Sequence, residues 1–398
     1  MKQQKGITLV ALVITVIILL ILAGITIAQI TNSGLFEKAK EAEARQKNAQ
    51  DLEDEILEQY EAEMGRYKNG SLEWPSEITE SKKISELKPA GASRVDQNTI
   101  LTDETEENKL AVIPKGFKLA TDSGESLEEG IVIEDAVGNQ FVWIPVGIEL
   151  NYSTEYKNLN KGSTGTVELN RYFFGYDQVS WTTSYAKNAG TETREGVGDA
   201  QIKRDASQDY YFYEFSEGEN KKAKDIAGFK ASVAKNHGYY IGRYEAGKAD
   251  NKIVSKNNVP VYNYLTRDQA LELAQKMYTE TYSTLGITAT SDLMNSYAWD
   301  TAVIYLERCG SNNDYAHEDR GTKTSLLSTG QSEDVQCKIN DMAKNVLEWT
   351  TEYCSNSGSP CVNRGGNYFY SNVYTSRRVD YTTSTSDAYL GFRPLLYL

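Results

Sequence analysis

Positive charge and histidine are both scarce in this chain. Its 398 residues hold 42 lysines and arginines against 56 aspartates and glutamates, and only two histidines, for a formal net charge of −14. Such a balance repels a phosphate backbone, which argues against nucleic acid as a partner. Common catalytic signatures are missing as well, because the sequence contains no Walker loop, no G-x-S-x-G elbow and no H-E-x-x-H zinc motif.

Cysteine is also rare, with four residues confined to the C-terminal third: Cys309, Cys337, Cys354 and Cys361. None belongs to a C-x-x-C motif, and two histidines in the whole chain give a zinc site little support. An even number of cysteines fits two disulfides in an oxidising compartment. Three pairings can be drawn, and we favour Cys354–Cys361, which closes a short polar loop and leaves Cys309–Cys337. Free buried thiols are the alternative.

The N-terminus carries a long uncharged stretch from Ile7 to Ile27. At about 1.5 Å per residue a helix of this length spans roughly 31 Å, which matches the hydrocarbon thickness of a bilayer. Lys2 and Lys5 precede it and favour a cytoplasmic start. We therefore expect residues 7–30 to form a single transmembrane helix at the cell membrane, with the C-terminal domain extracellular.

The wording of this stretch, KGITLVALVITVIILLILAGITI, resembles the class III leader of type IV pilins and pseudopilins. The resemblance implies that residues 1–6 are a leader, cut by a prepilin-type peptidase between Gly6 and Ile7. Pilins usually carry glutamate at the fifth mature position, and here that position is Ala11. Export and anchoring stand without the carboxylate, whereas assembly into a filament with other pilus components loses support.

Two segments with little core of their own follow the apolar stretch. Residues 31–66 are highly charged, and small or apolar residues recur every seven positions from Leu35 to Ile56, which predicts a helix with a thin apolar stripe. This helix is either a stalk that carries a domain off the membrane or a solvated helix with no partner. Residues 67–109 mix turn residues with acidic clusters, and we interpret them as a linker.

From residue 110 to the C-terminus the sequence has the patterns of a folded domain. Apolar, β-branched runs at Phe141–Val146 and Gly238–Gly247 predict strands. Residues 151–218 are polar and rich in glycine, asparagine, threonine and tyrosine without a clear period, so we expect insertion loops there.

Two helices are expected in the same domain. Apolar or small residues recur at helical spacing over Arg267–Tyr278, and Thr266 with Gln269 gives that helix a capping box. A second helix is predicted over Ser291–Glu307.

Six motifs of this domain occur in an order that is familiar. They resemble, in that order, the domain of the formylglycine-generating, sulfatase-modifying enzymes, which is a variant of the C-type-lectin fold. The resemblance covers about residues 110–398 and implies an α+β fold, irregular and rich in short strands and loops, with two helices packed on a small sheet. The motifs are FVWIPV, GYYIGRYEAG, VPVYNYLTRDQALELAQKM, DMAKNVLEWTTE, RGGNY and GFRPLL.

Three pieces of these motifs are interpreted as scaffold. Trp349 sits in an apolar/polar alternation that is typical of a core position. The two glycines of Arg364-Gly365-Gly366 permit a close backbone approach that a side chain would block. Gly391-Phe392-Arg393 predicts a core strand with a buried ionic anchor.

The catalytic groups of the resembled family do not carry over. Its copper-binding thiols would map to Tyr370 and Thr375, and neither residue supplies the soft sulfur that copper(I) selects. The related iron enzymes need a histidine cluster, whereas the two histidines here lie far apart in sequence. The family's calcium contacts would map to Asn345 and Glu348, with Lys344 in place of the usual glycine. We therefore expect no enzyme and no cofactor, and calcium stays open.

The segment Asn367–Tyr389 occupies the place of the catalytic thiols. It contains five tyrosines, four serines, four threonines and two asparagines, a composition that is typical of an antibody paratope. Tyrosine is abundant throughout, with 27 residues against 10 phenylalanines. The predicted ligand-contacting residues are Asn367, Tyr368, Tyr370, Asn372, Tyr374, Arg377, Arg378, Asp380 and Tyr381.

A subgroup on this scaffold comprises the diversified ligand-binding proteins of retroelements, whose variable codons lie just before a fixed ending, and this segment resembles theirs. We therefore expect an envelope-anchored, non-catalytic recognition or adhesion protein that binds an extracellular protein or glycan. A minor pilin or pseudopilin subunit is the alternative, and a formylglycine-generating-type oxidase is the second alternative. Arg377 and Arg378 suit a carboxylate or acidic sugar, or one of them pairs with Asp380.

Overall fold

The computed structural model describes residues 67–68, 71–159, 162–174, 195–205, 208–215, 221–318, 324–370 and 373–398. The expected leader, membrane helix and stalk (1–66) lie outside these residues. Within the described part of the chain, no helix is both long and apolar enough to span a bilayer. The chain divides into two compact units, Met1–Glu73 and Trp74–Leu398. The first unit contains the hairpin of β1 (Tyr67–Lys68) and β2 (Ser71–Leu72).

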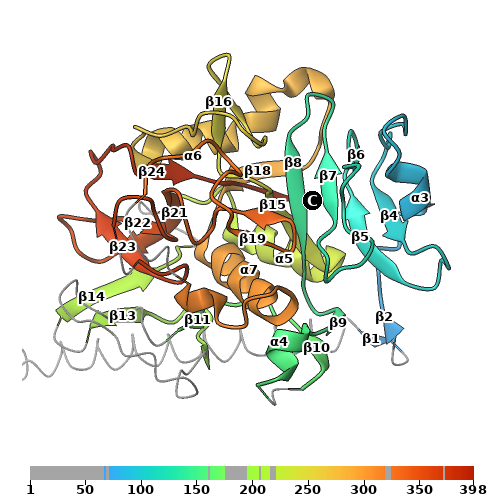
Figure 1. Cartoon of the computed structure of the whole chain (residues 1–398), viewed down its shortest axis with the longest axis horizontal. Helices are drawn as coiled ribbons and strands as arrows, with labels where there is room; N and C mark the ends of the chain where they lie inside the picture. Colours follow the sequence, from blue (N-terminus) through green and yellow to red (C-terminus); the bar gives the residue numbers. More distant parts are fainter. Residues whose placement is uncertain are drawn as a thin grey trace, which may run out of the picture. The chain divides into compact units, whose positions relative to one another are not determined.

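The second unit is a mixed α+β structure built mostly from strands, as expected (Figure 1). Its first large sheet is antiparallel and has the order β18-β25-β15-β8-β7-β6. The predicted strand motifs FVWIPV and GYYIG form its adjacent central strands. The strands are β6 (Lys118–Leu119), β7 (Val132–Glu134), β8 (Gln140–Pro145), β15 (Gly238–Gly242), β18 (Thr290–Leu293) and β25 (Pro394–Tyr397).

The second large sheet has the order β13-β14-β21-β22-β23, and β24 pairs with β21 in parallel. Two of its strands come from the stretch expected to form only loops, so this part of 151–218 is integrated into the domain. The strands are β13 (Ile202–Asp205), β14 (Gln208–Tyr213), β21 (Leu347–Cys354), β22 (Cys361–Arg364), β23 (Arg378–Tyr381) and β24 (Leu390–Phe392).

The expected linker 67–109 is structured from Trp74 onward and belongs to the second unit. A three-stranded sheet joins β3 (Ser81–Lys83), β4 (Thr99–Thr102) and β5 (Lys109–Ile113). Leu101 is fully buried and belongs to the main hydrophobic cluster. The interpretation as a linker was therefore wrong for this part, because short apolar runs between turns and charges are enough to add a small sheet to an existing core.

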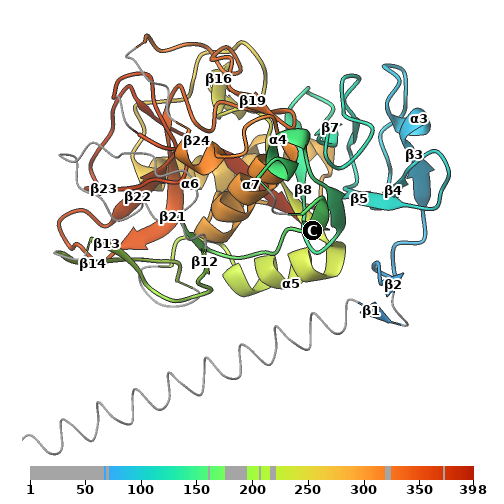
Figure 2. The ribbon, with the colours of Figure 1, turned by 60° about the horizontal axis from the view of Figure 1, so that its bottom comes forward.

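Helices and a further sheet cover the two faces of the first large sheet. On one face, the Tyr239 ring packs edge-on against Phe229 of α5 (Ile226–Asn236), with centroids 5.3 Å apart. The Tyr239 hydroxyl donates to the carbonyl of Ala298 in α7 (Ser296–Cys309) at 2.7 Å. On the other face, the Tyr240 hydroxyl donates to the carbonyl of Val112 in β5 at 3.0 Å. Helix α5 forms an outer helix of the unit (Figure 2).

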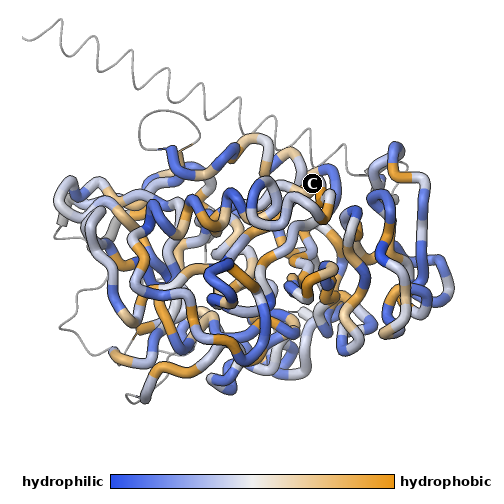
Figure 3. The backbone as a smooth tube through the Cα atoms, turned by 90° about the horizontal axis from the view of Figure 1, so that it is seen from above, coloured by the Kyte–Doolittle hydropathy of each residue, from blue (hydrophilic) through white to orange (hydrophobic). Residues whose placement is uncertain are grey.

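Helix α7 is the central helix of the unit, since every residue from Ser296 to Glu307 is buried. It contacts β8 of the first large sheet and β21 of the second. Helix α6 (Arg267–Gln275) contacts β18 and β21. Short hydrophobic stretches alternate with hydrophilic ones along the described chain (Figure 3), as expected of a domain assembled from many short elements.

The predicted helices are found with altered bounds. The capping box of Thr266 and Gln269 is present at the start of α6, and the helix passes into a π-helix, η1 (Met277–Thr281). The helix expected over Ser291–Glu307 begins only at Ser296, with Asn295 as its N-cap. The residues before it form strand β18, because they pair with the C-terminal strand β25.

The remaining described elements are short and connect the larger ones. They include the hairpins β9-β10, β11-β12, β16-β17 and β19-β20. Their bounds, with those of the small helices, are α3 (Ile84–Leu87), β9 (Glu149–Asn151), α4 (Thr154–Lys157), β10 (Thr164–Thr166), β11 (Tyr172–Phe173), β12 (Glu195–Gly196), β16 (Gly247–Ala249), β17 (Lys252–Val254), η2 (Ser283–Leu285), η3 (Tyr315–His317), β19 (Val335–Gln336) and β20 (Ile339–Asn340).

The favoured disulfide Cys354–Cys361 is absent, and all four cysteines are thiols. Cys361 lies opposite Tyr353 in the β21–β22 ladder. Because successive side chains of a strand point to opposite faces, Cys354 faces away from Cys361. Cys354 packs with Phe212 and Val362 in a small separate cluster, whereas Cys361 belongs to the main core. The expectation failed because proximity in sequence does not fix the face of the sheet.

Candidate ligand-binding face

The C-terminal segment is held in place by a backbone contact at the Arg-Gly-Gly motif. Gly365 has a φ of +86°, and a Cβ atom there would lie 2.6 Å from the Met342 carbonyl oxygen. A Cβ atom on Gly366 would overlap the carbonyl of Ala343. The sequence-based expectation of a close backbone approach at these glycines is thus confirmed. The chain leaving this motif is pressed against the loop that precedes β21.

Three further hydrogen bonds bring separate loops together beside this contact. The Tyr368 N–H donates to the Asn345 carbonyl at 2.8 Å, and the Thr324 N–H donates to the Tyr368 carbonyl at 3.0 Å. The Leu327 N–H donates to Oδ1 of Asn345 at 2.9 Å. The loops around residues 324–327, 345 and 368 therefore form one continuous surface.

Tyr264 joins this surface from the loop before α6. Its N–H donates to the Asp387 carbonyl at 3.1 Å, and the neighbouring Asn263 side chain donates to the Ala388 carbonyl at 2.8 Å. Tyr264 is 63% exposed and has a φ of +56°, in the left-handed region. That conformation costs roughly 1–2 kcal/mol for a residue with a Cβ atom. Because the ring is exposed, hydrophobic burial does not offset this cost.

The aromatic rings on this surface contact one another. Phe369 stacks on Tyr389 with centroids 5.9 Å apart and an interplanar angle of 17°. Tyr370 meets both rings edge-on, at 4.9 Å from Phe369 and 5.2 Å from Tyr389. Tyr381 packs edge-on against the buried Trp349 at 6.1 Å. Burial raises the pKa of the Tyr381 and Tyr389 phenols, so both hydroxyls stay protonated at neutral pH and can donate hydrogen bonds.

We call this surface the aromatic face. Among the described residues, seven large hydrophobic side chains are exposed, and four of them lie here. Exposed apolar groups gathered in one patch, rather than scattered singly, mark interaction sites. The face consists of Tyr264, Leu326, Leu327, Tyr368, Phe369, Tyr370, Tyr381 and Tyr389.

Only some of the predicted contact residues lie on this face. Tyr368, Tyr370 and Tyr381 do, and all three are partly exposed. Arg377 and Asp380 are also partly exposed, and the Asn356 side chain donates to Asp380 at 3.1 Å. Asn372 lies outside the described residues.

The other three predicted contact residues are buried and support the fold. Oδ1 of Asn367 accepts from the Phe369 and Tyr370 N–H groups at 2.8 and 2.6 Å, which fixes the start of the loop. Tyr374 packs edge-on against His317. Arg378 is 3% exposed and binds two internal carboxylates. The expectation that these three side chains are exposed was wrong, because the polar segment passes through the interior before it reaches β23.

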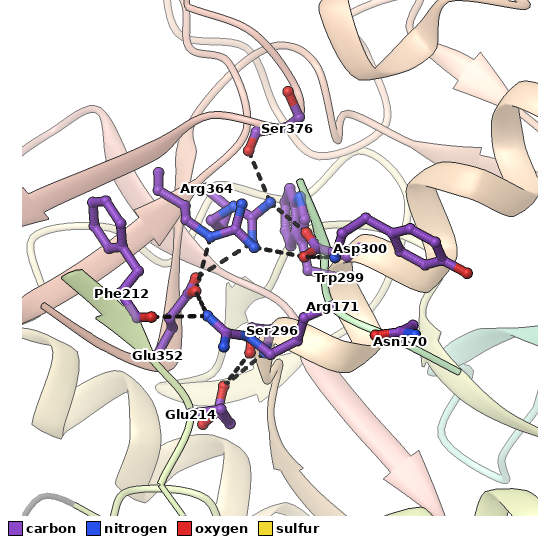
Figure 4. A network of polar contacts seen from close by, with 12 residues as sticks. Asn170, Arg171, Phe212, Glu214, Ser296, Trp299, Asp300, Glu352, Arg364 and Ser376 are labelled. Atoms are coloured by element: carbon purple, nitrogen blue, oxygen red, sulfur yellow. Dashed lines mark hydrogen bonds and ion pairs between the residues drawn. The ribbon is translucent and has the colours of Figure 1, made fainter. Parts of the chain in front are cut away.

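Figure 4 shows a buried ion cluster that includes Arg364, Asp300 and Glu352. Arg378 binds the same two carboxylates and belongs to this cluster. Its Nε lies 2.8 Å from Glu352 and its Nη2 lies 2.5 Å from Asp300. Arg364 bridges the same two carboxylates, and Arg171 binds Glu352 at 2.8 Å. Burial acts to raise the pKa of Glu352, but the three guanidinium groups outweigh it and hold the pKa at about 2. The sequence left open that Arg377 or Arg378 pairs with Asp380. For Arg378, the structure shows these internal carboxylates as the partners instead.

A second buried ion pair confirms the predicted anchor at the end of the chain. Arg393 is fully buried and binds both oxygens of Glu348, at 2.6 and 3.0 Å. It also donates to the Gly242 and Asn340 carbonyls at 2.7 Å. This anchor ties the last strand to β21 and to the end of β15.

The two residues to which the resemblance maps the family's calcium contacts are engaged by protein donors. Both Glu348 oxygens face Arg393, and Oδ1 of Asn345 accepts from Leu327. The Asn345 amide donates to Glu245 at 2.8 Å. Within the described ranges, no group of three or more histidine, cysteine or acidic side chains is placed to hold a metal ion. Asn345 and Glu348 therefore do not fit the role of calcium ligands.

The two positions to which the resemblance maps catalytic thiols have different surroundings. Tyr370 lies on the aromatic face, whereas Thr375 is buried and its N–H donates to the Glu318 carbonyl at 3.2 Å. The Thr375 carbonyl accepts from the Trp299 indole at 3.0 Å. One position thus serves the surface and the other serves the core.

Sequence reasoning missed five members of the aromatic face: Tyr264, Leu326, Leu327, Phe369 and Tyr389. Phe369 lies within the predicted segment but was passed over because the prediction favoured side chains that hydrogen-bond. Tyr264 and the two leucines come from distant loops, and no local pattern places them beside residue 368. The excess of tyrosine was the only available signal for Tyr264.

No family model matches the chain, and no curated protein matches it. The resemblance to the sulfatase-modifying enzymes therefore stays a prediction. Solved structures with some similarity include Treponema denticola variable protein 1, with 16% identity over 40% of this chain and 85% of that chain and a TM-score of 0.30. PvdO from Pseudomonas aeruginosa has 13% identity, coverage of 41% and 82%, and a TM-score of 0.28. The Major Tropism Determinant U1 variant has 12% identity, coverage of 80% and 99%, and a TM-score of 0.28. Similarities at TM-scores this low do not extend to function.

Proposed function

We propose that this chain is a non-catalytic recognition protein that binds its ligand on the aromatic face. The observation that carries the proposal is the gathering of exposed rings and leucines from three separate parts of the chain onto one surface. Aromatic side chains supply large contact area at low conformational cost, and tyrosine hydroxyls add hydrogen bonds. The rings rest on a scaffold fixed by buried ion pairs, which preorganises the face.

The chemistry of the face favours a protein ligand over a glycan. Leu326 and Leu327 are exposed beside the rings and offer aliphatic contact, which suits the apolar core of a protein interface. One side of the Phe369 ring stacks on Tyr389, so less of its flat surface is available for stacking on a sugar. A polar rim is supplied by the threonines and serines of residues 382–386, several of which are exposed.

The absence of thiols at two positions supports a non-catalytic role. Tyr370 and Thr375 stand where the resembled oxidases need sulfur, and the thiols of this chain lie elsewhere. The motif resemblance also supports a C-type-lectin-like frame beneath the face. We further propose, from the sequence, that the apolar stretch 7–30 anchors the protein so that the face is displayed outside the cell. Protection of the second unit from added protease on intact cells would count against that display.

Binding can be tested without knowing the ligand in advance. The full chain is screened against a library of displayed extracellular protein domains and, in parallel, against a glycan array. Each reproducible hit is then measured with the variants Tyr264→Ala and Phe369→Ala. We expect a protein hit whose affinity falls at least tenfold in both variants, because truncating an aromatic hot-spot residue costs about 2 kcal/mol or more and a tenfold loss corresponds to about 1.4 kcal/mol.

The chain offers a matched control for these variants. Leu159 is 41% exposed, close to the 42% of Phe369, but it lies after α4 and outside the aromatic face. Leu159→Ala should leave the affinity unchanged. Equal affinity losses in Leu159→Ala and Phe369→Ala, or no loss in either face variant, would refute the proposed site. A reproducible glycan hit with the same mutational pattern would keep the face and overturn the choice of a protein ligand.

A further inference from the structure

Two of the four cysteines are brought together by the fold. Cys309 is the last residue of α7, and Cys337 lies in the turn between β19 and β20. Next to them, Oε1 of Gln336 accepts from the Ser311 N–H at 2.8 Å and from the Ser311 hydroxyl at 3.1 Å. The residue two positions after the end of the helix is therefore hydrogen-bonded to the hairpin that carries Cys337. Both thiols are partly buried and pack against the main core.

Tyr305 gives a second measure of this proximity. It lies one helical turn before Cys309, on the same side of α7, since residues four apart share a helix face. Its hydroxyl donates to the Leu127 carbonyl at 2.6 Å and also interacts with the Cys337 thiol. Each of the two thiols acts electrostatically on the Tyr305 phenol. The space between α7 and the β19–β20 turn therefore holds both sulfur atoms.

The turn itself is an unusual place for cysteine. Gln336 pairs with Ile339, so Cys337 and Lys338 are the two turn residues, with φ values of +44° and +66°. Two-residue hairpin turns with positive φ at both positions favour asparagine and glycine. The turn is also fixed from outside, because a Cβ atom on Gly130 would overlap the Cys337 carbonyl. The turn conformation therefore does not favour cysteine, and the side chain is held beside α7 by packing against the main core.

We propose that Cys309 and Cys337 form an intrachain disulfide by thiol–disulfide exchange with an oxidant that is itself a disulfide. One thiolate attacks a sulfur of the oxidant, which forms a mixed disulfide and releases the oxidant's first thiol. The other cysteine thiolate then attacks the protein sulfur of the mixed disulfide. The Cys309–Cys337 bond forms, the second oxidant thiol leaves, and two protons pass from the protein thiols to the released thiols. The cross-link joins the end of α7 to the β19–β20 hairpin.

The remaining two cysteines provide an internal control. Cys354 and Cys361 are closer in sequence, but their side chains lie on opposite faces of the second large sheet. A disulfide requires Cβ atoms about 3.5–4.5 Å apart and pointing toward each other. The fold therefore brings the pair that is 28 positions apart into one neighbourhood and keeps the pair that is seven apart on opposite faces of a sheet.

Burial affects how fast the exchange proceeds. It raises the pKa of the Cys337 thiol to about 12, and it raises the pKa of Cys309 as well. Because the thiolate is the attacking species, few molecules react at neutral pH. The exchange should accelerate about tenfold for each unit of pH between 7 and 9.

The wild-type full chain in detergent tests the proposal directly. It is equilibrated with oxidised glutathione at pH 8.5, free thiols are alkylated, and the unreduced protein is mapped by mass spectrometry. We expect one cross-linked peptide pair, Cys309 with Cys337, and alkylated Cys354 and Cys361. Thermal unfolding should then occur a few degrees higher than after reduction with dithiothreitol, because the link closes a long loop. Alkylated Cys309 and Cys337, glutathione adducts alone, or links to Cys354 or Cys361 would overturn the proposal.

Two variants separate this disulfide from a general effect of oxidation. Cys354→Ser should keep both the cross-link and the shift in unfolding temperature, whereas Cys337→Ser should lose both. If Cys337→Ser does not fold, Cys309→Ser provides the same comparison from the helix side. A shift in unfolding temperature that persists without either sulfur would contradict the assignment.

Discussion

The buried ion cluster beneath the C-terminal segment allows a sharp prediction about stability. Glu352 accepts from Arg378 and Arg171 at 2.8 Å and lies 3.4 Å from Arg364, and all four side chains are fully buried. The substitution Glu352→Gln keeps the size of the side chain and removes one negative charge. Arg364 and Arg378 would then share the single carboxylate of Asp300, and Arg171 would lose the carboxylate that it binds.

The expected cost follows from leaving buried charge without a partner. Removing one member of a buried ion pair typically destabilises a protein by about 3–5 kcal/mol. We expect a loss in this range in the free energy of unfolding for Glu352→Gln. The exposed pair Lys276–Glu272 on α6 is the control, and Glu272→Gln should cost less than about 0.5 kcal/mol because solvent screens such pairs.

Urea denaturation followed by tryptophan fluorescence measures both variants, since Trp299 and Trp349 are buried in the domain. The pKa of Glu352 is lowered to about 2. Its stabilising charge is therefore fully present above the ordinary pKa of 4.5 and is lost only as the pH falls toward 2. The difference between the wild type and Glu352→Gln should stay constant from pH 8 to pH 5. A loss below 1 kcal/mol, or one equal to that of Glu272→Gln, would refute this account of the cluster.

Three other predictions concern single residues. Gly366→Ala should destabilise the fold by at least about 2 kcal/mol, because its Cβ atom would overlap the Ala343 carbonyl. Gly358→Ala is the control in the same urea assay, because its Cβ atom would meet no backbone atom. Burial raises the pKa of Glu214 to about 7, so the folded protein holds this proton more tightly than the unfolded chain does. The wild type should therefore lose stability relative to Glu214→Gln as the pH rises from about 4.5 to 7. A constant difference would contradict the shift. Tyr264→Gly should be more stable than Tyr264→Ala by about 1 kcal/mol, because glycine adopts a positive φ without strain. Both variants should lose ligand binding. Equal unfolding free energies would show that the loop is not strained.

The sequence predicted local features well where one chain segment carries the whole signal. The capping box of α6, the strands FVWIPV and GYYIG, the Gly365-Gly366 contact and the Arg393 anchor were all expected and are present. Features that depend on pairing were missed. The strand β18 forms because β25 lies beside it, and Thr99–Thr102 pair into a sheet although they lie in the expected linker.

The candidate site shows the same division. The tyrosine-rich composition of residues 367–389 indicated a surface for recognition, but composition does not tell which residues of an irregular segment turn inward. Arg378 points inward because it pairs with the buried carboxylates of Asp300 in α7 and Glu352 in β21. Tyr264 is outward because its loop is tied to the Asp387 carbonyl. Contacts between distant parts of the chain decide both cases.

The two buried arginine anchors, Arg378 at the start of β23 and Arg393 after β24, have a consequence for evolution. Between them, residues 382–386 are mostly exposed and make hydrogen bonds chiefly among themselves, as Thr382 does with Ser384 and Thr385. Mutations in this stretch therefore meet little resistance from folding. A lineage could replace these five residues repeatedly, trying new binding partners while the rest of the molecule stays unchanged.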